Sequence, residues 1–213
     1  SIPRNEGTFR SVTVIAPEGT LVNAKPPAPM TMCTVFPAQQ IIHAIWQALG
    51  AADPSRACAG WGMNAYPLSS AVGYDGRVST MYHWAGASGG GAVDGRDGFP
   101  QVGPLCAFGA LILPNAEMSE QLYPVRVQCQ ELRTDGAGAG KFRGGSGAHY
   151  AADIMLPSEI AFRAESVKKA WAYGTNGGET GATSTVMLTP VDGETYDAPT
   201  YGVIDIEPSR VDV

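Results

Sequence analysis

The chain has 213 residues, of which 44% are hydrophobic and 16% charged, the composition of a globular protein long enough to bury a core. Its net charge of -6 argues against nucleic acid or an anionic membrane as a partner, because both attract basic surfaces. No apolar run approaches the roughly 18 residues of a membrane-spanning helix, so we expect a soluble, cytoplasmic protein.

The first element that we expect is a strand. Residues 10–16, RSVTVIA, alternate and are rich in β-branched side chains, and the turn sequence at 17–19 ends them. The segment KPPAP at 25–29 cannot continue a central strand or a helix, because proline lacks the backbone donor that both need. This region therefore predicts a strand followed by an extended connection.

The clearest pattern in the chain predicts an amphipathic helix over about residues 37–49. Its apolar residues recur at helical spacing and form a stripe that we expect to be buried: Ala38, Ile41, Ile42, Ile45, Trp46 and Leu49. Pro37 suits the first turn, and Gly50 suits the left-handed position after the last turn. His43 lies off the stripe, which favours a partly solvated surface histidine over a catalytic one.

The rest of the chain favours strands separated by glycine-rich loops. Strands or irregular core segments are expected at 77–84, 105–114, 124–133 and 183–191, and a hairpin turning at 157–158 is expected within 148–166. With no internal repeat and no clear linker, the expected fold is α+β: a β-rich single domain over 1–213 with one main helix.

The glycine-rich stretch TDGAGAGKFRGGSGAHY at 134–150 suggests a nucleotide-binding loop at first sight. It fails as a P-loop, because Phe142 follows Gly140-Lys141 where a hydroxyl residue is required, and its alternating glycines do not fit the dinucleotide-binding pattern. Two interpretations remain open. In the first, the backbone N–H groups of the stretch bind an anion together with Lys141 and Arg143. In the second, the glycines are needed because two backbone segments pack closely against each other.

The loop GGGAVDGRDG at 89–98 carries Asp94 and Asp97 on either side of Arg96. It lacks the terminal glutamate and the spacing of a calcium loop, so a turn stabilised by aspartate side chains is the better interpretation. His83, which precedes this loop, either lines a pocket or packs in the core.

The cysteines and histidines do not form a recognisable catalytic or metal motif. The three histidines are too far apart in sequence to suggest a triad or a metal site. The cysteines have no CxxC pair, which favours buried free thiols in a reducing compartment and no zinc site: Cys33, Cys58, Cys106 and Cys129.

Several motifs, taken in order, resemble the second half of the hydantoinase B/oxoprolinase family. The matching segments are NEGTFR (5–10), IAPEGTLVN (15–23), ASGGGAVDGRDG (87–98), NAEMSEQLYPV (115–125), ELRTDGAGAGKFRGGSG (131–147) and WAYGTNGGETG (171–181). The resemblance covers nearly the whole chain. It implies a separately encoded or cleaved C-terminal half of a much longer subunit.

The resemblance also implies a function. Members of the family are large subunits of ATP-dependent enzymes that open cyclic amides, and related acetone and acetophenone carboxylases attach carbon from bicarbonate to ketones. It places ATP and Mg²⁺ on a hydantoinase A-like partner with an actin-like fold, and any divalent metal on a chain carrying the N-terminal half. No cofactor and no metal are expected on this chain alone, which we expect to be inactive without its partners.

Three hypotheses follow, namely part of a cyclic-amide hydrolase, part of a ketone carboxylase, and a non-catalytic scaffold half of either. The candidate residues for binding a substrate or an anionic intermediate are Lys141, Arg143, Asp94, Asp97, His83 and Arg10.

Overall fold

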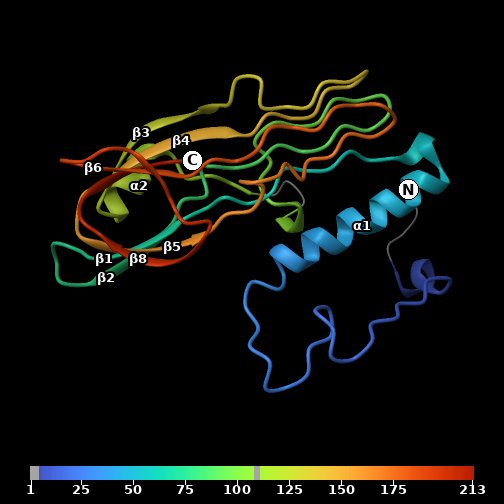
Figure 1. Ribbon diagram of the computed structural model, residues 1–213, viewed down its shortest axis with the longest axis horizontal. Coiled ribbons are helices and arrows are strands. Elements are labelled where there is room, and N and C mark those ends of the chain that lie inside the picture. The colour runs from blue at the N-terminus through green and yellow to red at the C-terminus, as the bar shows by residue number, and fades with distance from the viewer. Residues whose placement is uncertain (1–4, 108–110) are drawn as a thin grey trace.

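A computed structural model describes residues 5–107 and 111–213 and shows two antiparallel sheets packed face to face (Figure 1). The four-stranded sheet has the order β2 (Val78–Tyr82), β1 (Leu68–Val72), β5 (Ser158–Arg163), β8 (Tyr201–Ile206). The five-stranded sheet has the order β3 (Val125–Leu132), β4 (Ala148–Ile154), β9 (Ser209–Asp212), β6 (Met187–Pro190), β7 (Tyr196–Asp197). The expected α+β, β-rich single domain is confirmed.

The core lies between the two sheets and draws on both. Ile160 and Phe162 of β5 meet Tyr150 of β4, Leu188 of β6 and Val211 of β9, and each of the five is at most 1% exposed. Burying an aliphatic side chain of this size stabilises the fold by about 1.5–3 kcal/mol. Alternation of buried and exposed residues along β5 and β9 follows from this arrangement, because successive side chains of a strand point to opposite faces.

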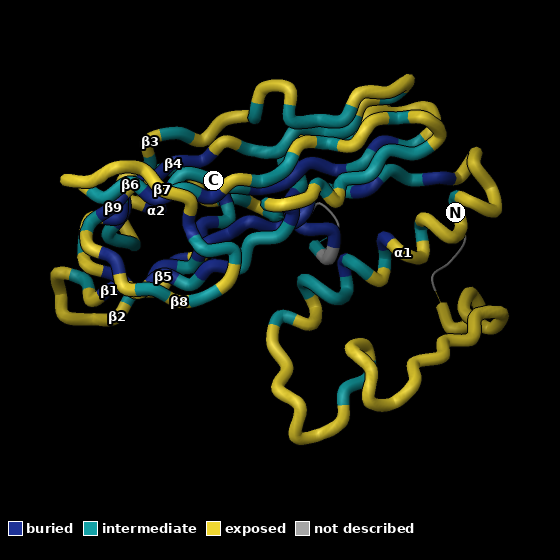
Figure 2. The backbone as a smooth tube through the Cα atoms, viewed as in Figure 1, coloured by how far each residue is buried: buried dark blue, intermediate teal, exposed yellow. Residues whose placement is uncertain are grey.

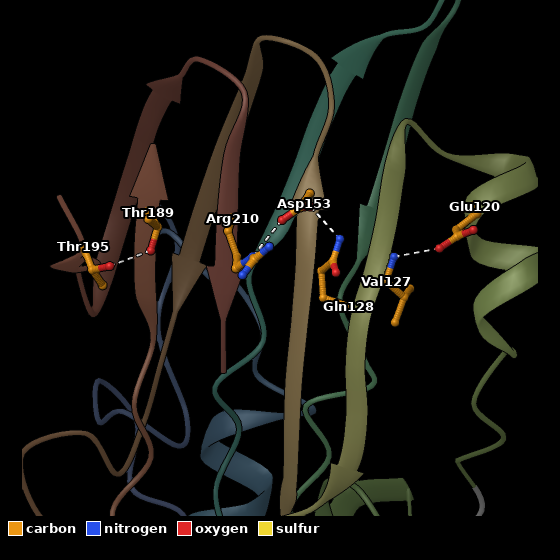
Figure 3. A network of polar contacts seen from close by, with 7 residues as sticks. All are labelled: Glu120, Val127, Gln128, Asp153, Thr189, Thr195 and Arg210. Carbon is orange, nitrogen blue, oxygen red and sulfur yellow. Dashed lines mark hydrogen bonds and ion pairs between the residues drawn. The ribbon is translucent and has the colours of Figure 1, made fainter. Parts of the chain in front are cut away.

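The outer face of the five-stranded sheet is polar (Figure 3). Asp153 accepts hydrogen bonds from Arg210 Nε at 2.8 Å and from Gln128 Nε2 at 2.6 Å, joining β9, β4 and β3. At the edge, β3 has an irregular register after Val127, and Glu120 Oε1 accepts the Val127 N–H at 2.9 Å. A side chain thus uses a backbone donor that the edge strand would otherwise expose.

Two α-helices and three short 3₁₀ turns complete the described residues: α1 (Phe36–Ala52), α2 (Ala116–Leu122), η1 (Glu6–Phe9), η2 (Pro54–Arg56) and η3 (Leu105–Ala107). The seven-residue α2 was not expected, because so short a helix shows too little periodicity to be recognised. Its sequence signal is Asn115, whose side chain accepts the Met118 N–H at 2.9 Å as an N-cap. Among the described residues, no helix is both long and apolar enough to cross a membrane.

The expected helix is confirmed as α1, with Pro37 in its first turn, but its buried side is turned away from the centre of the expected stripe, of which three residues are half-buried and three are exposed. Gln39 and His43 are 0% and 3% exposed, whereas Ile45 and Leu49 of the apolar stripe are 50% and 61% exposed. The helix continues through Gly50, so that glycine is not its left-handed cap. The polar side packs against the loop at 61–62 through Gln39 and His43, and this packing overrides the amphipathic pattern.

Three strand predictions are confirmed, as β2, β3 and β6 within 77–84, 124–133 and 183–191. The prediction of a strand at 10–16 is wrong: residues 12–16 are exposed and irregular, with no neighbouring strand to supply hydrogen bonds. The turn expected at 17–19 is present, closed by the Gly19 N–H and the Asn23 carbonyl at 2.8 Å.

The predicted hairpin within 148–166 is also wrong, although both of its strands exist. β4 pairs with β3 and β9, whereas β5 pairs with β1 and β8, so the turn carries the chain from one sheet to the other. Of the segment 105–114, residues 105–107 form η3, 108–110 lie outside the described residues, and 111–114 are irregular.

Candidate functional site

Glycine-rich segments from four parts of the chain run side by side beyond the ends of the sheets (Figure 1). Between them lies a cleft of about 380 Å³, lined mostly by backbone and small side chains. Its walls come from residues within 57–65, 86–94, 133–149 and 172–185. A volume in this range suits a small organic molecule.

The cleft is held together by hydrogen bonds between loops rather than by regular strands. The Gly145 N–H bonds to the Gly90 carbonyl at 2.8 Å, the Gly90 N–H to the Phe99 carbonyl at 2.9 Å, and the Gly98 N–H to the Arg143 carbonyl at 2.8 Å. A β-carbon at Gly145 would overlap the backbone carbonyl of Phe99. Close approach of backbones therefore requires glycine here, which supports the packing interpretation of this stretch.

The anion-nest interpretation finds little support in the same stretch. The consecutive N–H groups of Arg143, Gly144 and Gly145 donate to Asp97, to the Gly138 carbonyl and to the Gly90 carbonyl. Within 134–150, all of which is described, Asp135 is the one residue with positive φ, whereas a nest alternates right- and left-handed residues. An anion would thus depend on side-chain charge more than on these donors.

Four of the six predicted site residues lie on the two neighbouring loops at 89–98 and 134–150, and two of them, Lys141 and Asp94, line the cleft. Lys141 Nζ lies 3.6 Å from an Asp94 oxygen, and Arg143 donates to Asp135 at 2.9 Å through its guanidinium and to Asp97 at 2.8 Å through its backbone N–H. Asp97 therefore fixes the neighbouring loop rather than its own turn, which a backbone bridge between Val93 and Arg96 closes.

These charged side chains are accessible. The side chain of Lys141 is 81% exposed and that of Arg143 is 54% exposed, so the ion pairs are weak and can exchange partners. Lys141 also lines the cleft, as does Asp94. Lys141 is therefore the predicted residue best placed to meet an anionic group in the cleft.

The other two predicted residues do not reach this site. His83 is 0% exposed and bonds to Ser69 Oγ at 2.9 Å and to Tyr150 OH at 3.0 Å, between the two sheets. This position supports the core alternative for His83, and burial lowers its pKa to about 4. Arg10 lies on the exposed segment before α1, at the end of η1.

A buried polar cluster under α1 was missed by sequence reasoning. Gln39 Nε2 donates to the Gly62 carbonyl at 2.9 Å, and Gln39 Oε1 accepts from Asn64 at 3.4 Å. Gln40 donates to Glu165 Oε1 at 3.3 Å. The other oxygen of Glu165 is buried without a hydrogen-bond partner among the described residues.

Glu165 is consequently an unusual carboxyl group. Burial raises its pKa to about 7, against the smaller opposing effect of the Gln40 hydrogen bond. It adjoins Ser166, which lines the cleft. The two adjacent glutamines at the start of α1 are the one local feature that marks this cluster in the sequence. They do not predict its burial, because polar residues beside an apolar stripe ordinarily indicate a solvated surface.

His43 belongs to the same layer and is buried, so its prediction as a partly solvated histidine is wrong. Its Nε2 accepts the Trp61 N–H at 3.1 Å, which leaves the proton on Nδ1. Its ring meets Tyr173 edge-on, with ring centres 5.6 Å apart. Burial lowers its pKa, so it stays neutral and holds α1 to two walls of the cleft.

One group of metal-ligand types is present among the described residues, although the spacing in sequence gave no sign of it. Cys129, Glu131 and His149 each place a ligand atom within 4.8 Å of the others. His149 also lines the cleft. Cys33 and Cys58 are further free thiols, and Cys33 is exposed, contrary to the expectation of burial.

Comparison with known proteins supplies the remaining evidence. The sequence model of the hydantoinase B/oxoprolinase family matches residues 1–210. The beta subunit of the caprolactamase of Pseudomonas jessenii is 44% identical over 151 residues, which are 68% of this chain and 26% of that protein. The B component of a putative D-/L-hydantoinase from a Pseudomonas species is 28% identical over 180 residues, covering 81% of this chain and 28% of that protein.

Solved structures agree. The crystal structure of the ATP-dependent caprolactamase from Pseudomonas jessenii matches with a TM-score of 0.83 and 30% identity, covering 100% of this chain and 38% of that chain. The nucleotide-free acetone carboxylase matches with a TM-score of 0.64 and 12% identity over 79% of this chain and 27% of that chain, a likeness of fold alone. The chain thus spans well under half the length of these relatives.

Proposed function

Since the chain belongs to the hydantoinase B/oxoprolinase family, we propose that it forms part of an ATP-dependent hydrolase that opens cyclic amides such as lactams or hydantoins. One observation carries the proposal: identity to the beta subunit of caprolactamase is 44%, and the caprolactamase structure matches along the whole chain. Membership of such a complex also agrees with a cleft that is mostly backbone and holds few charged side chains.

The cleft suits a small, weakly charged ring. Its walls are mostly glycine and alanine, whose small side chains leave room for a compact ring. ATP, bound by a hydantoinase A-like partner subunit with Mg²⁺, supplies the phosphoryl group that activates the inert amide oxygen. In this proposal Lys141 holds the resulting anionic group at the end of the cleft, because a cation stabilises developing negative charge.

The surface of the chain supports a further partner that carries the N-terminal half of a hydantoinase B-like subunit. Ile41, Ile45 and Leu49 of α1 are 41%, 50% and 61% exposed, and Ile15 and Leu21 in the segment before α1 are 83% and 87% exposed. Figure 2 shows that most of this described segment is exposed. A contiguous apolar surface of this kind marks an interface. We place the N-terminal half, and any divalent metal that it binds, on this side of α1.

The interface can be tested by pull-down with the companion chains. Ile45→Glu is expected to weaken assembly at least about tenfold, because it buries an unpaired charge. Val191→Glu is the matched control, since Val191 is also an exposed apolar residue, 75% exposed, but lies in the turn after β6. Equal assembly by the two variants would show that Ile45 of α1 does not lie in the interface.

The reaction itself is tested on the reconstituted complex. ATP hydrolysis stimulated by lactams, hydantoins or oxoproline is the expected result, with Lys141→Ala lowering turnover about tenfold or more. Stimulation by ketones plus bicarbonate would support instead a ketone carboxylase, the alternative favoured by the shared fold with acetone carboxylase. Full activity of Lys141→Ala and of Arg143→Ala would support a scaffold role, and no stimulation by either class would refute both enzymatic hypotheses.

A further inference from the structure

The outer face of β3 and β4 brings together three side chains of different donor types. Cys129 and Glu131 are two residues apart on β3, so both point to the same face. Glu131 is paired directly with His149 of β4 in the antiparallel register. The sulfur, carboxylate and imidazole groups therefore meet because of strand pairing, across an interval of sequence that no short metal motif spans.

The distances between these groups suit a tetrahedral ion. Cys129 Sγ lies 3.5 Å from His149 Nδ1, and Glu131 Oε1 lies 3.5 Å from the same nitrogen. A tetrahedral Zn²⁺ with a bond of about 2.3 Å to sulfur and about 2.0 Å to nitrogen and oxygen sets the sulfur and nitrogen about 3.5 Å apart, and nitrogen and oxygen about 3.3 Å apart. We infer that Cys129, Glu131 and His149 form a Zn²⁺ site with one coordination position left for water.

The donor set selects zinc among the common divalent ions. Calcium and magnesium take oxygen ligands, whereas a thiolate with an imidazole and a carboxylate is typical of zinc. The side chains of His149 and Glu131 are 48% and 69% exposed, so an ion reaches them without opening the fold.

The position of the site gives it two consequences. β3 is the edge strand of its sheet, and an ion bound across it would fasten β3 to β4. His149 also lines the glycine-walled cleft, whereas Cys129 and Glu131 do not, so the site adjoins the wall of that cleft. The inference rests on this chain's residues alone and is independent of the proposed hydrolase reaction.

Titration of the metal-free 213-residue chain with Co²⁺ and with Zn²⁺ tests the site without any activity assay. We expect one ion per chain and, with Co²⁺, the intense absorption of a cobalt–thiolate bond. Cys129→Ser should abolish that absorption and weaken Zn²⁺ binding by on the order of 100-fold, and Glu131→Gln should weaken it by about tenfold. Cys33→Ser, which removes another free thiol, is the matched control and should change neither.

Thermal unfolding provides a second readout. Zn²⁺ should raise the midpoint of unfolding of the original chain and of Cys33→Ser but not of Cys129→Ser, because only a ligand of the folded state shifts that midpoint. Failure of the original chain to bind Zn²⁺ at sub-millimolar concentration overturns the inference. So does a Cys129→Ser chain, shown by circular dichroism to be folded, that retains the cobalt–thiolate absorption and the same affinity.

Discussion

His83 should make the stability of this protein depend strongly on pH. Its ring is fully buried and bridges Ser69 in β1 to Tyr150 in β4, so it ties the two sheets together. Burial lowers its pKa to about 4, compared with about 6.5 in the unfolded chain. The folded state therefore resists protonation, whereas the unfolded state takes up a proton below about pH 6.5.

The sign and size of the pH effect on stability follow from this difference in pKa. The contribution of neutral His83 is fully present above the unfolded pKa and is lost as pH falls from about 6.5 towards 4, since the unfolded state binds more protons there. Between pH 7 and pH 5 the loss amounts to about 2 kcal/mol for an unfolded pKa of about 6.5 and a folded pKa of about 4. No screening correction applies to a ring that is 0% exposed.

The test compares the original chain with His83→Gln, which keeps a neutral polar group of similar length. Urea unfolding followed by tryptophan fluorescence at the two pH values gives each free energy of unfolding. The original chain should lose about 2 kcal/mol more than the variant on going from pH 7 to pH 5, even though the variant is less stable at both. Equal losses in the original chain and His83→Gln would falsify the reasoning.

Four further variants test the cleft walls and the charged groups at or near them. Gly145→Ala should cost more than about 3 kcal/mol of stability, because its β-carbon would overlap the Phe99 carbonyl, whereas Gly144→Ala, whose β-carbon has room, should cost less than about 1 kcal/mol in the same urea titration. Glu165→Gln should raise the free energy of unfolding by about 1–3 kcal/mol more at pH 8 than at pH 5. The reason is that a carboxyl group with a pKa of about 7 opposes folding increasingly as pH rises from about 4.5. An equal effect of the substitution at both pH values would contradict this. Lys141→Ala should change the free energy of unfolding by less than about 1 kcal/mol, because its ion pair is exposed, and a larger loss would show a structural role.

Local pattern was enough for those features that depend on neighbouring residues. The existence and start of α1, the strands β2 and β3, and the β-rich class follow from hydrophobic spacing and from proline positions, which act on the backbone within a few residues, whereas the end of α1 does not. Lys141, Arg143, Asp94 and Asp97 were all candidates from the sequence. The contacts that join their two loops were not predicted.

The local sequence pattern could not predict which strands pair with one another. The alternation in β4 and β5 predicts strands equally well in a hairpin or in two sheets, and their register with β9 and β8 is decided by long-range contacts. The same is true of His149, which meets Cys129 and Glu131 through cross-strand pairing.

The sequence by itself determined the glycine-rich loops and the family to which their order points, because a backbone that must approach another backbone tolerates no side chain. Only the tertiary structure decided which side of α1 is buried and that His83 and His43 lie in the interior. The physical reason is that burial depends on what packs against a residue from elsewhere in the chain. An apolar stripe such as that of Ile45 and Leu49 indicates that these side chains favour burial, but it does not indicate which surface buries them.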